Sequence, residues 1–243
     1  MNEKFDYIKH YKTDAEEFDY FEERPAATAH DERRVREYIL IKIPTSATTI
    51  LDVGSGSAWI ASEKTKDNIK VFSLDISKIN LLKAKKKIPS PNHIQVAADS
   101  FKLPFKNNSF DVVVASEVIE HVVSPQDFVR ELFRVVKTNG SLIITTPYKE
   151  KIRYALCIHC NKKTPLNGHL HSFDENKLQS YFNNLPSEKL EWFTFGNKAL
   201  IYFMTYVVLK FLPFTLWEIV DKLANLIWNK PVHILVRCKK KAD

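Results

Sequence analysis

The chain has 243 residues, 44% of them hydrophobic and 27% charged, which is ordinary for one globular α/β domain with a sizeable core. Its net charge is +7, but most of the basic residues are dispersed, so nucleic acid is not an expected partner. Three cysteines and an N-terminus without an apolar run argue against a disulfide-stapled secreted protein, and we expect a cytoplasmic location.

The first thirty residues combine aromatic and acidic side chains, including Tyr7, Tyr11, Tyr20 and Glu23. Two interpretations of residues 1–30 stand side by side: a helical lid over a binding site, or a poorly ordered arm. A helix is predicted from about Asp31 because apolar residues recur there at helical spacing. The predicted apolar stripe of this helix consists of Val35, Tyr38, Ile39 and Ile41.

Predicted strands and helices then alternate. The strands are expected at residues 49–53, 70–74, 93–97, 110–115 and 141–145. Helices are expected at residues 79–87 and from Ser124, as the N-cap, to about Lys137, because Ser-Pro-x-Asp is a typical helix start. This alternation predicts a parallel sheet with helices on both faces. Later, a helix is expected at 174–182 and strands at 191–195 and 233–238.

A glycine-rich turn follows the first predicted strand. Asp52, Val53, Gly54, Ser55 and Gly56 end the strand, and the two glycines allow a sharp turn that a ligand can approach closely. The following helix would offer unpaired N–H groups to that ligand. A dinucleotide site is disfavoured, because Trp59 stands where the third glycine of that fingerprint would be.

Polar residues also follow the next three predicted strands. Asp75 ends the second strand, at the spacing expected for a carboxylate that binds ribose hydroxyls. Asp99 follows the third strand, and Ser116 and Glu117 follow the fourth. Since the carboxyl ends of parallel strands share one edge of the sheet, these residues are predicted to form one nucleotide-like site.

These segments resemble the class I S-adenosylmethionine-dependent methyltransferases, particularly the small-molecule group that includes ubiquinone and menaquinone biosynthesis enzymes. The resemblance covers roughly residues 31–147. The matching segments are residues 51–57 (LDVGSGS), 74–77 (LDIS), 99–105 (DSFKLPF), 110–113 (FDVV), 116–122 (SEVIEHV) and 132–140 (LFRVVKTNG).

The resemblance implies a Rossmann-like, doubly wound, seven-stranded and mostly parallel sheet with an antiparallel last strand, and a helical insertion before that strand. It implies S-adenosylmethionine as cofactor. Asp75 would hold the ribose, Asp99 and Ser100 would face the adenine, and Ser116 and Glu117 would border the methyl group. The full predicted cofactor set is Asp52, Gly54, Ser55, Gly56, Asp75, Ile76, Asp99, Ser100, Ser116 and Glu117.

The expected function is methyl transfer from this cofactor to a small-molecule or lipid-like acceptor. An RNA methyltransferase and a non-catalytic cofactor-binding scaffold are the alternatives. A general base is needed only if the acceptor must lose a proton, and no catalytic residue can be assigned. The candidates are Glu117, His121, Tyr148, His169 and His171.

Residues 148–173 form a cysteine- and histidine-containing insertion. Cys157 and Cys160 have the spacing of a zinc knuckle, and His169 and His171 could complete four ligands of a structural zinc. The alternative is a reduced thiol pair on a surface loop, with the histidines shaping the substrate pocket. Both interpretations stay open at this point.

Residues 197–230 form a second, apolar insertion within what we expect to be a single domain spanning residues 1–243. The uninterrupted apolar run is too short for a membrane span, and Pro213 splits it. Two angled helices that cover the substrate site are one interpretation. The other is an in-plane contact of residues 199–228 with a membrane surface, which would make the protein peripheral at the membrane.

Overall fold

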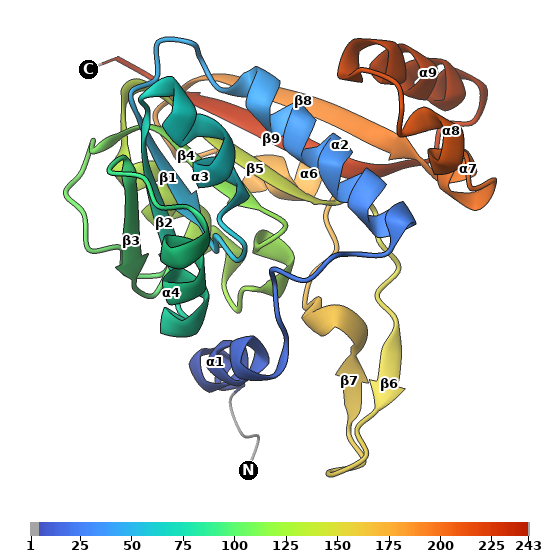
Figure 1. Cartoon of the computed structure of the whole chain (residues 1–243), viewed down its shortest axis with the longest axis horizontal. Helices are drawn as coiled ribbons and strands as arrows, with labels where there is room; N and C mark the ends of the chain where they lie inside the picture. Colours follow the sequence, from blue (N-terminus) through green and yellow to red (C-terminus); the bar gives the residue numbers. More distant parts are fainter. Residues whose placement is uncertain (1–4, 243) are drawn as a thin grey trace.

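The structure is a computed structural model that describes residues 5–242. A seven-stranded sheet with strand order β3-β2-β1-β4-β5-β9-β8 forms its centre (Figure 1). Strands β1 to β5 are parallel, whereas β9 runs antiparallel to both β5 and β8. This confirms the predicted fold class. The strands are β1 (Thr49–Val53), β2 (Lys70–Asp75), β3 (His93–Ala97), β4 (Phe110–Ser116), β5 (Val136–Pro147), β8 (Ser187–Asn197) and β9 (Pro231–Lys240).

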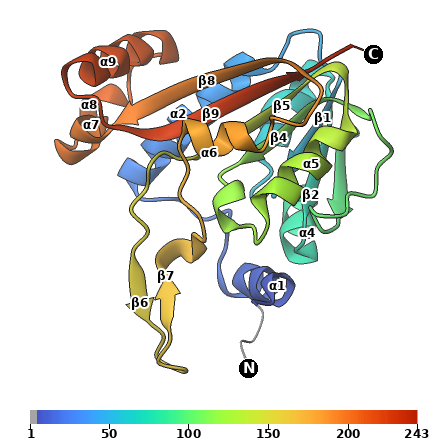
Figure 2. The same ribbon diagram turned by 180° about the vertical axis from the view of Figure 1, so that it is seen from behind.

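Helices cover both faces of the sheet (Figures 1 and 2). The helices α2 (Ala26–Lys42), α3 (Trp59–Lys64) and α4 (Lys78–Lys87) lie on one face, where Ile39 and Ile60 join a buried cluster with Val112 and Leu235. On the other face lie α5 (Pro125–Val135) and α6 (Glu175–Ser180). The strands between these two layers are buried on both sides, which explains the continuous apolar run at Val112, Val113 and Val114.

The predicted apolar stripe of α2 needs one correction. Val35, Tyr38 and Ile39 are buried as expected, but Ile41 is 51% exposed. Two residues correspond to about 200° of helix rotation, so Ile41 faces away from the side that Ile39 buries. Arg34, which is 1% exposed, lies on the packed side instead.

Helix starts follow the expected capping chemistry only in part. Pro125 is the first residue of α5, as predicted, but the Ser124 hydroxyl donates to Asp127 Oδ2 at 2.7 Å and accepts no backbone N–H. By contrast, the Asp174 carboxylate accepts from the backbone N–H of Lys177 at the start of α6, at 2.8 Å. β5 begins at Val136, five residues before the predicted start, because the strand continues directly from α5.

Three segments lie outside the central layers. Helix α1 (Tyr7–Glu17) lies below the carboxyl edge of β1–β4, and a hairpin of β6 (Tyr154–Leu156) and β7 (Lys163–Pro165) projects away from the body (Figure 1). The short turns η1 (Thr65–Asp67), η2 (Ile119–His121) and η3 (Leu166–Gly168) complete the connections. The apolar insertion contains α7 (Lys198–Tyr202), α8 (Tyr206–Leu209) and α9 (Phe214–Ile227), so three helices replace the expected two.

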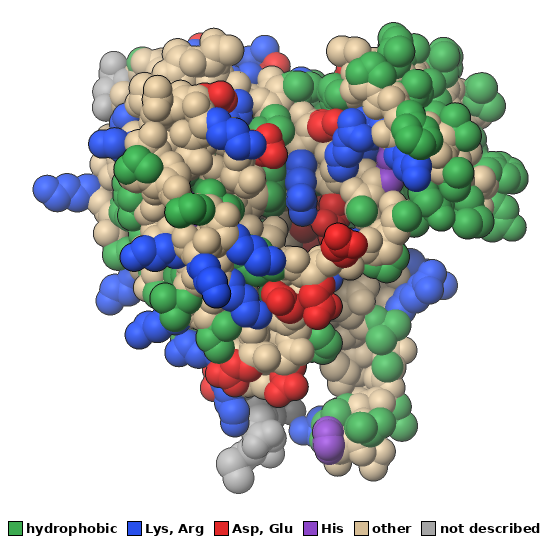
Figure 3. All heavy atoms as spheres, viewed as in Figure 1, with side chains coloured by type: hydrophobic (Ala, Val, Ile, Leu, Met, Phe, Trp, Pro, Cys, Tyr) green, Lys and Arg blue, Asp and Glu red, His purple; other side chains and the backbone are tan. Residues whose placement is uncertain are grey.

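Helices α7–α9 present an apolar surface, which Figure 3 shows as a dense group of hydrophobic side chains at the upper right. We call this the α7–α9 surface. Its most exposed large residues are Tyr202, Phe203, Val208, Phe211, Leu226 and Ile227, between 69% and 87% exposed. Within residues 5–242, none of the helices has the length and apolar character needed to cross a bilayer.

Candidate functional site

A cleft of 670 Å³ opens where the carboxyl ends of β1–β4 meet. This volume is within the usual range for pockets that hold small-molecule cofactors. Every one of the four strand ends that sequence analysis singled out contributes to the cleft wall. The contributing residues include Gly54 and Gly56 after β1, Asp75 and Ile76 after β2, Asp99 and Ser100 after β3, and Glu117, Val118 and His121 after β4.

The glycine turn is held in a conformation that a side chain would disturb. Gly54 and Gly56 have φ angles of +68° and +46°, in the left-handed region that favours glycine. A Cβ on Gly54 would lie 2.7 Å from Val118 Cγ2. The N–H of Gly54 donates to the carbonyl of Leu74 at 2.8 Å, which ties the turn to the end of β2. The cleft wall therefore depends on the bare backbone of Gly54.

Asp75 connects the turn to the neighbouring strand. Its carboxylate accepts from the backbone N–H groups of Gly56, at 3.0 Å, and Ser77, at 2.8 Å. Burial raises the pKa of Asp75, while these two bonds act to lower it. Asp75 thus fixes the shape of the turn and presents its carboxyl group to the cleft.

Helix α1 closes the cleft from the N-terminal side. The Tyr7 hydroxyl donates to Asp99 Oδ2 at 2.6 Å, and the Tyr11 hydroxyl donates to the carbonyl of His121 at 3.3 Å. Tyr20 lies 3.5 Å from the position that a Cβ on Gly56 would take. Residues 5–30 thus contribute a wall, while residues 1–4 of the predicted arm or lid lie outside the described chain. The aromatic residues at 7, 11 and 20 were the only sequence signal for this wall.

Three predicted cofactor residues do not line the cleft. Asp52 is 2% exposed, and burial with the nearby Asp75 carboxylate raises its pKa to about 8. Ser55 is 4% exposed. Ser116, the third of these residues, accepts a hydrogen bond from Thr145 Oγ1 at 3.3 Å. Asp52 Oδ2 and Ser55 Oγ are buried with no hydrogen-bond partner among residues 5–242, and neither residue lines the cleft.

Glu117 occupies an unusual position at the end of β4. Its φ of +54° is strained for a residue with a side chain, and such strain gathers at functional sites. Among the described residues, Glu117 Oε1 is buried without a hydrogen-bond partner, and Oε2 lies 3.6 Å from His233 Nδ1. His233 Nε2 in turn donates to Asp31 Oδ2 at 2.9 Å. These two carboxylates raise the pKa of His233 to about 10, so the imidazole is protonated between them.

A cluster of possible metal ligands adjoins the cleft. One oxygen of Glu120 and one nitrogen each of His121 and His169 lie within 4.8 Å of one another. The outer ring nitrogens already have partners: Nδ1 of His121 donates to the Gly168 carbonyl at 3.3 Å, and Nδ1 of His169 donates to Glu150 Oε2 at 2.5 Å.

His121 Nε2 lies 4.0 Å from Glu120 Oε1. An outer partner on one ring nitrogen of each histidine is typical of metal-ligating histidines. Burial, together with His169, lowers the pKa of His121 to about 4 and leaves it neutral, the form that binds metals. Burial and the Glu117 carboxylate raise the pKa of Glu120, which is 1% exposed. One carboxylate and two imidazoles are a donor set that suits zinc, manganese or iron.

The structure does not bring together the four predicted zinc ligands, which is a correction to the sequence-based set. Cys157 and Cys160 lie in the turn at the tip of the β6–β7 hairpin, whereas His169 and His171 follow its base. Glu150 holds His169, and the His171 ring donates to the Val122 carbonyl at 3.0 Å. Within residues 5–242, the only group of three or more close ligands is the Glu120 cluster.

Of the five catalytic candidates, the structure groups three. Glu117 and His121 line the cleft, and His169 stacks edge-on against His121. Tyr148 is elsewhere, because its hydroxyl donates to Glu175 Oε1 at 2.8 Å. His171 is engaged by the backbone of Val122 and does not line the cleft.

Known proteins resemble this chain both in sequence and in fold. A family description named "Methyltransferase domain" matches residues 51–144, which include the glycine turn and the segment from Ser116 to Val122. The chain is thus similar to methyltransferase domains over residues 51–144. Its fold is that of a solved S-adenosylmethionine-dependent methyltransferase from Listeria monocytogenes, with a TM-score of 0.61 over 87% of this chain and 100% of that one, at 14% identity.

The curated relatives that match the chain include O-methyltransferases. Ubiquinone biosynthesis O-methyltransferase of Rickettsia canadensis is 34% identical over 131 residues, 50% of this chain and 54% of the relative. Malonyl-[acyl-carrier protein] O-methyltransferase of a Marinomonas strain is 31% identical over 137 residues, 54% of this chain and 50% of the relative. The chain thus spans about half the length of the curated relatives it matches.

Proposed function

We propose that this protein transfers a methyl group from S-adenosylmethionine to an oxygen atom of a small, lipid-like acceptor. The observation that carries the proposal is the convergence of Gly54, Asp75, Asp99 and Glu117 on one cleft at the carboxyl ends of β1–β4. Transfer to oxygen, and a small-molecule acceptor, are supported by the names of the two curated relatives described above.

The chain's own residues would bind and orient the cofactor. The bare backbone at Gly54 and Gly56 leaves room for its methionine part, and Asp75 would accept from the ribose hydroxyls. Asp99 and Ser100 border the place for the adenine. Tyr7 and Tyr11 would keep water out of the cleft. Most of the catalysis would come from the protein's holding the acceptor in line with the methyl group.

We include a divalent cation in this proposal, held by Glu120, His121 and His169. When bound, such an ion supplies Lewis-acid stabilisation of a hydroxyl in its deprotonated form. Glu120 and the two Nε2 atoms would hold it, and Glu150 and Gly168 would orient the two rings. His121 lines the cleft, so an acceptor hydroxyl bound beside the cofactor would be within reach of this cluster.

The acceptor side of the proposal rests on the α7–α9 surface. Its exposed residues, such as Phe211, Leu226 and Ile227, form an apolar area, and Lys198, Lys222 and Lys230 stand on the same helices and their flanks. Apolar residues beside lysines suit the interface of an anionic membrane. We therefore propose a peripheral membrane contact through residues 199–228, from which a lipid-like acceptor would be drawn.

The direct test is turnover with methyl-labelled S-adenosylmethionine. The probe acceptor is decyl 3,4-dihydroxybenzoate in mixed micelles, and the readout is label in the aromatic methoxy product by mass spectrometry. We expect transfer that chelator suppresses and zinc or manganese restores. Label in a total RNA fraction and none in this or other phenolic acceptors would favour the RNA methyltransferase alternative. Cofactor binding without transfer to either would favour the scaffold.

A further inference from the structure

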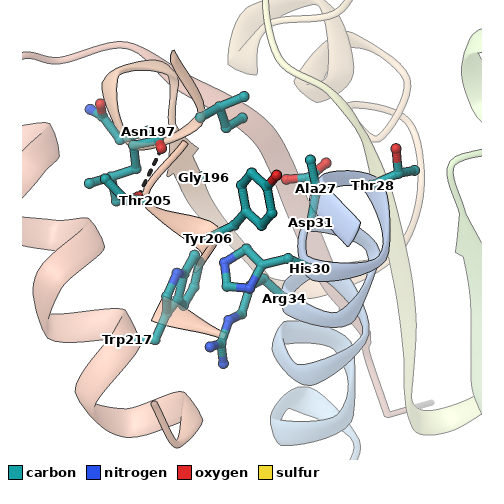
Figure 4. Close-up of a pocket in the computed structure, with 12 residues that line it drawn as sticks. Ala27, Thr28, His30, Asp31, Arg34, Gly196, Asn197, Thr205, Tyr206 and Trp217 are labelled. Carbon is teal, nitrogen blue, oxygen red and sulfur yellow. Dashed lines mark hydrogen bonds between the residues drawn. The ribbon is translucent and has the colours of Figure 1, made fainter. Parts of the chain in front are cut away.

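A second cavity, of 220 Å³, lies beside the cleft between α2 and the α7–α9 helices (Figure 4). Its wall comes from the first half of α2, the end of β8 and the three insertion helices. The residues that line it include Ala27, His30, Arg34, Leu200, Tyr206 and Trp217. The cavity is too small for the cofactor, and it has room for a single ring or a medium-length aliphatic chain.

Two buried nitrogen atoms on residues that line this cavity have no hydrogen-bond partner within residues 5–242. Arg34 is 1% exposed, and its terminal nitrogens donate to Glu37 Oε2 at 2.7 Å and to the carbonyl of Leu209 at 2.7 Å. Its Nε–H is buried and unbonded, and the same is true of His30 Nδ1. An unsatisfied buried donor costs about 1–3 kcal/mol, so a ligand atom that accepts a hydrogen bond here would be favoured.

The remaining lining combines apolar and aromatic side chains with four polar ones, Thr28, Asp31, Asn197 and Thr205. Figure 4 shows the rings of His30, Tyr206 and Trp217 facing one another, with Arg34 beside them. The guanidinium carbon of Arg34 lies 4.9 Å from the centroid of the Trp217 ring. The Arg34 charge is balanced by Glu37, so the cavity offers a hydrogen bond and not a free positive charge. This combination fits an apolar ligand that carries one accepting oxygen.

The cavity adjoins the exposed α7–α9 surface and is linked to the cleft wall by side-chain contacts. Ile201, which lines it, is 47% exposed, and the neighbouring Tyr202 and Phe203 are 78% and 69% exposed. On the inner side, Asp31 lines the cavity and bonds His233, which lies 3.6 Å from Glu117 in the cleft wall. A ligand entering from the α7–α9 surface would thus be linked to the cleft wall through two contacts, Asp31–His233 and His233–Glu117.

We propose that this cavity is a separate binding site for a neutral, medium-length amphiphile: an aliphatic chain or ring that carries a hydroxyl or carbonyl oxygen. The oxygen accepts from Arg34 Nε and His30 Nδ1, and the apolar part lies against Tyr206 and Trp217. This site takes no part in holding the cofactor, so the inference goes beyond the proposed methyl transfer and does not depend on it.

The test uses the full chain without cofactor or acceptor. The probe is 9-bromo-1-nonanol, whose bromine quenches tryptophan fluorescence, and 1-bromononane is the matched compound without the oxygen. We expect saturable quenching by the alcohol with an affinity about fivefold higher than that of the alkyl bromide, the value of one hydrogen bond. The Trp217→Phe variant should lose most of the quenching.

Two further variants make the outcome decisive. Ala27→Phe places a ring at the exposed mouth of the cavity without altering the core, and it should abolish the saturable component. His30→Phe removes one of the two donors, so it should reduce the preference for the alcohol while leaving quenching by 1-bromononane in place. Non-saturable quenching, equal affinity for the two probes, or an unchanged Ala27→Phe variant would overturn the proposal. Cofactor binding, measured in parallel, reports separately on the proposed function.

Discussion

The rings of His121 and His169 lie 4.8 Å apart and nearly perpendicular, although one follows β4 and the other follows the β6–β7 hairpin. Each ring has its Nδ1 engaged, one by the Gly168 carbonyl and the other by Glu150. The hairpin insertion therefore contributes to the edge of the cleft through its base, and its cysteine-bearing tip is directed elsewhere.

This pairing predicts a metal site with a measurable outer partner. His169→Ala should abolish stoichiometric binding of zinc or manganese, measured by elemental analysis after equilibrium dialysis. Glu150→Gln keeps all three ligands and loses only the carboxylate behind His169, so metal affinity should fall about 10- to 100-fold. His159→Ala, in the exposed hairpin turn, is the matched control and should bind as wild type. Loss of metal binding in His159→Ala, with binding retained in His169→Ala, would refute the assignment of His169 as a ligand.

The glycine turn predicts a specific steric defect. Gly54→Ala combines the strain of a positive φ with a Cβ 2.7 Å from Val118 Cγ2. We expect a loss of stability of roughly 1–3 kcal/mol, measured by urea unfolding, and cofactor binding weakened at least about tenfold. Adding Val118→Ala removes the close contact and should recover part of the stability. If Gly54→Ala alone were as stable as wild type, the close contact between its Cβ and Val118 would be contradicted.

The Asp31–His233–Glu117 contacts predict a stability that depends on alkaline pH. The pKa of His233 is raised to about 10 from an ordinary value of 6.5, so its contribution is complete below pH 6.5 and declines as pH rises toward 10. Asp31→Asn removes the charge-assisted bond to Nε2 and should cost about 1.5–3 kcal/mol at pH 7.

The measurement is the free energy of unfolding by denaturant between pH 6 and pH 10. The gap between wild type and Asp31→Asn should shrink over that range, because the imidazole loses its charge in the wild type. Glu32→Gln is a control on the same helix, since Glu32 pairs only with exposed arginines. A gap that stays constant with pH would show that the Asp31–His233 contact does not require a protonated ring.

The α7–α9 surface predicts binding to anionic vesicles. A triple variant, Phe211→Ser, Leu226→Ser and Ile227→Ser, removes three side chains that are 78% to 87% exposed and that make little contact with the core. Vesicles of phosphatidylcholine and phosphatidylglycerol should sediment the wild type, and the variant should bind at least about tenfold more weakly. Leu82→Ser, 68% exposed on α4, is the control. Equal sedimentation of the wild type, the triple variant and Leu82→Ser would exclude the α7–α9 surface as the membrane contact.

Local sequence patterns predicted the central sheet well, because each signal was contained in a few residues. β1 and β3 have the predicted bounds, and the helix that begins at Pro125 was visible from its first four residues. The predicted burial of Ile41 was wrong, because periodicity identifies an apolar stripe without showing how much of it a neighbouring element covers. The third insertion helix was missed because α7 and α8 are only five and four residues long, too short for a periodic signal.

The site was less predictable where it depends on contacts between distant segments. Cysteine and histidine spacing suggested one zinc site, but the β6–β7 pairing separates the thiols from the imidazoles, and Glu120 joins His121 and His169 instead. The bond between Asp31 and His233 joins α2 to β9, which no local pattern encodes. Asp52 and Ser55 lie in the right segment, yet their side chains are buried and do not line the cleft.

The central claim is that the cleft at β1–β4 binds S-adenosylmethionine through the glycine turn and Asp75. Calorimetric titration with S-adenosylhomocysteine tests it most directly, using the wild type, Asp75→Ala and the surface control Asp67→Ala. We predict one site per chain in the wild type and control, and binding weakened at least about tenfold in Asp75→Ala, as expected for loss of hydrogen bonds to a charged group. Absence of binding in the wild type, or an unchanged affinity in Asp75→Ala, would contradict the account.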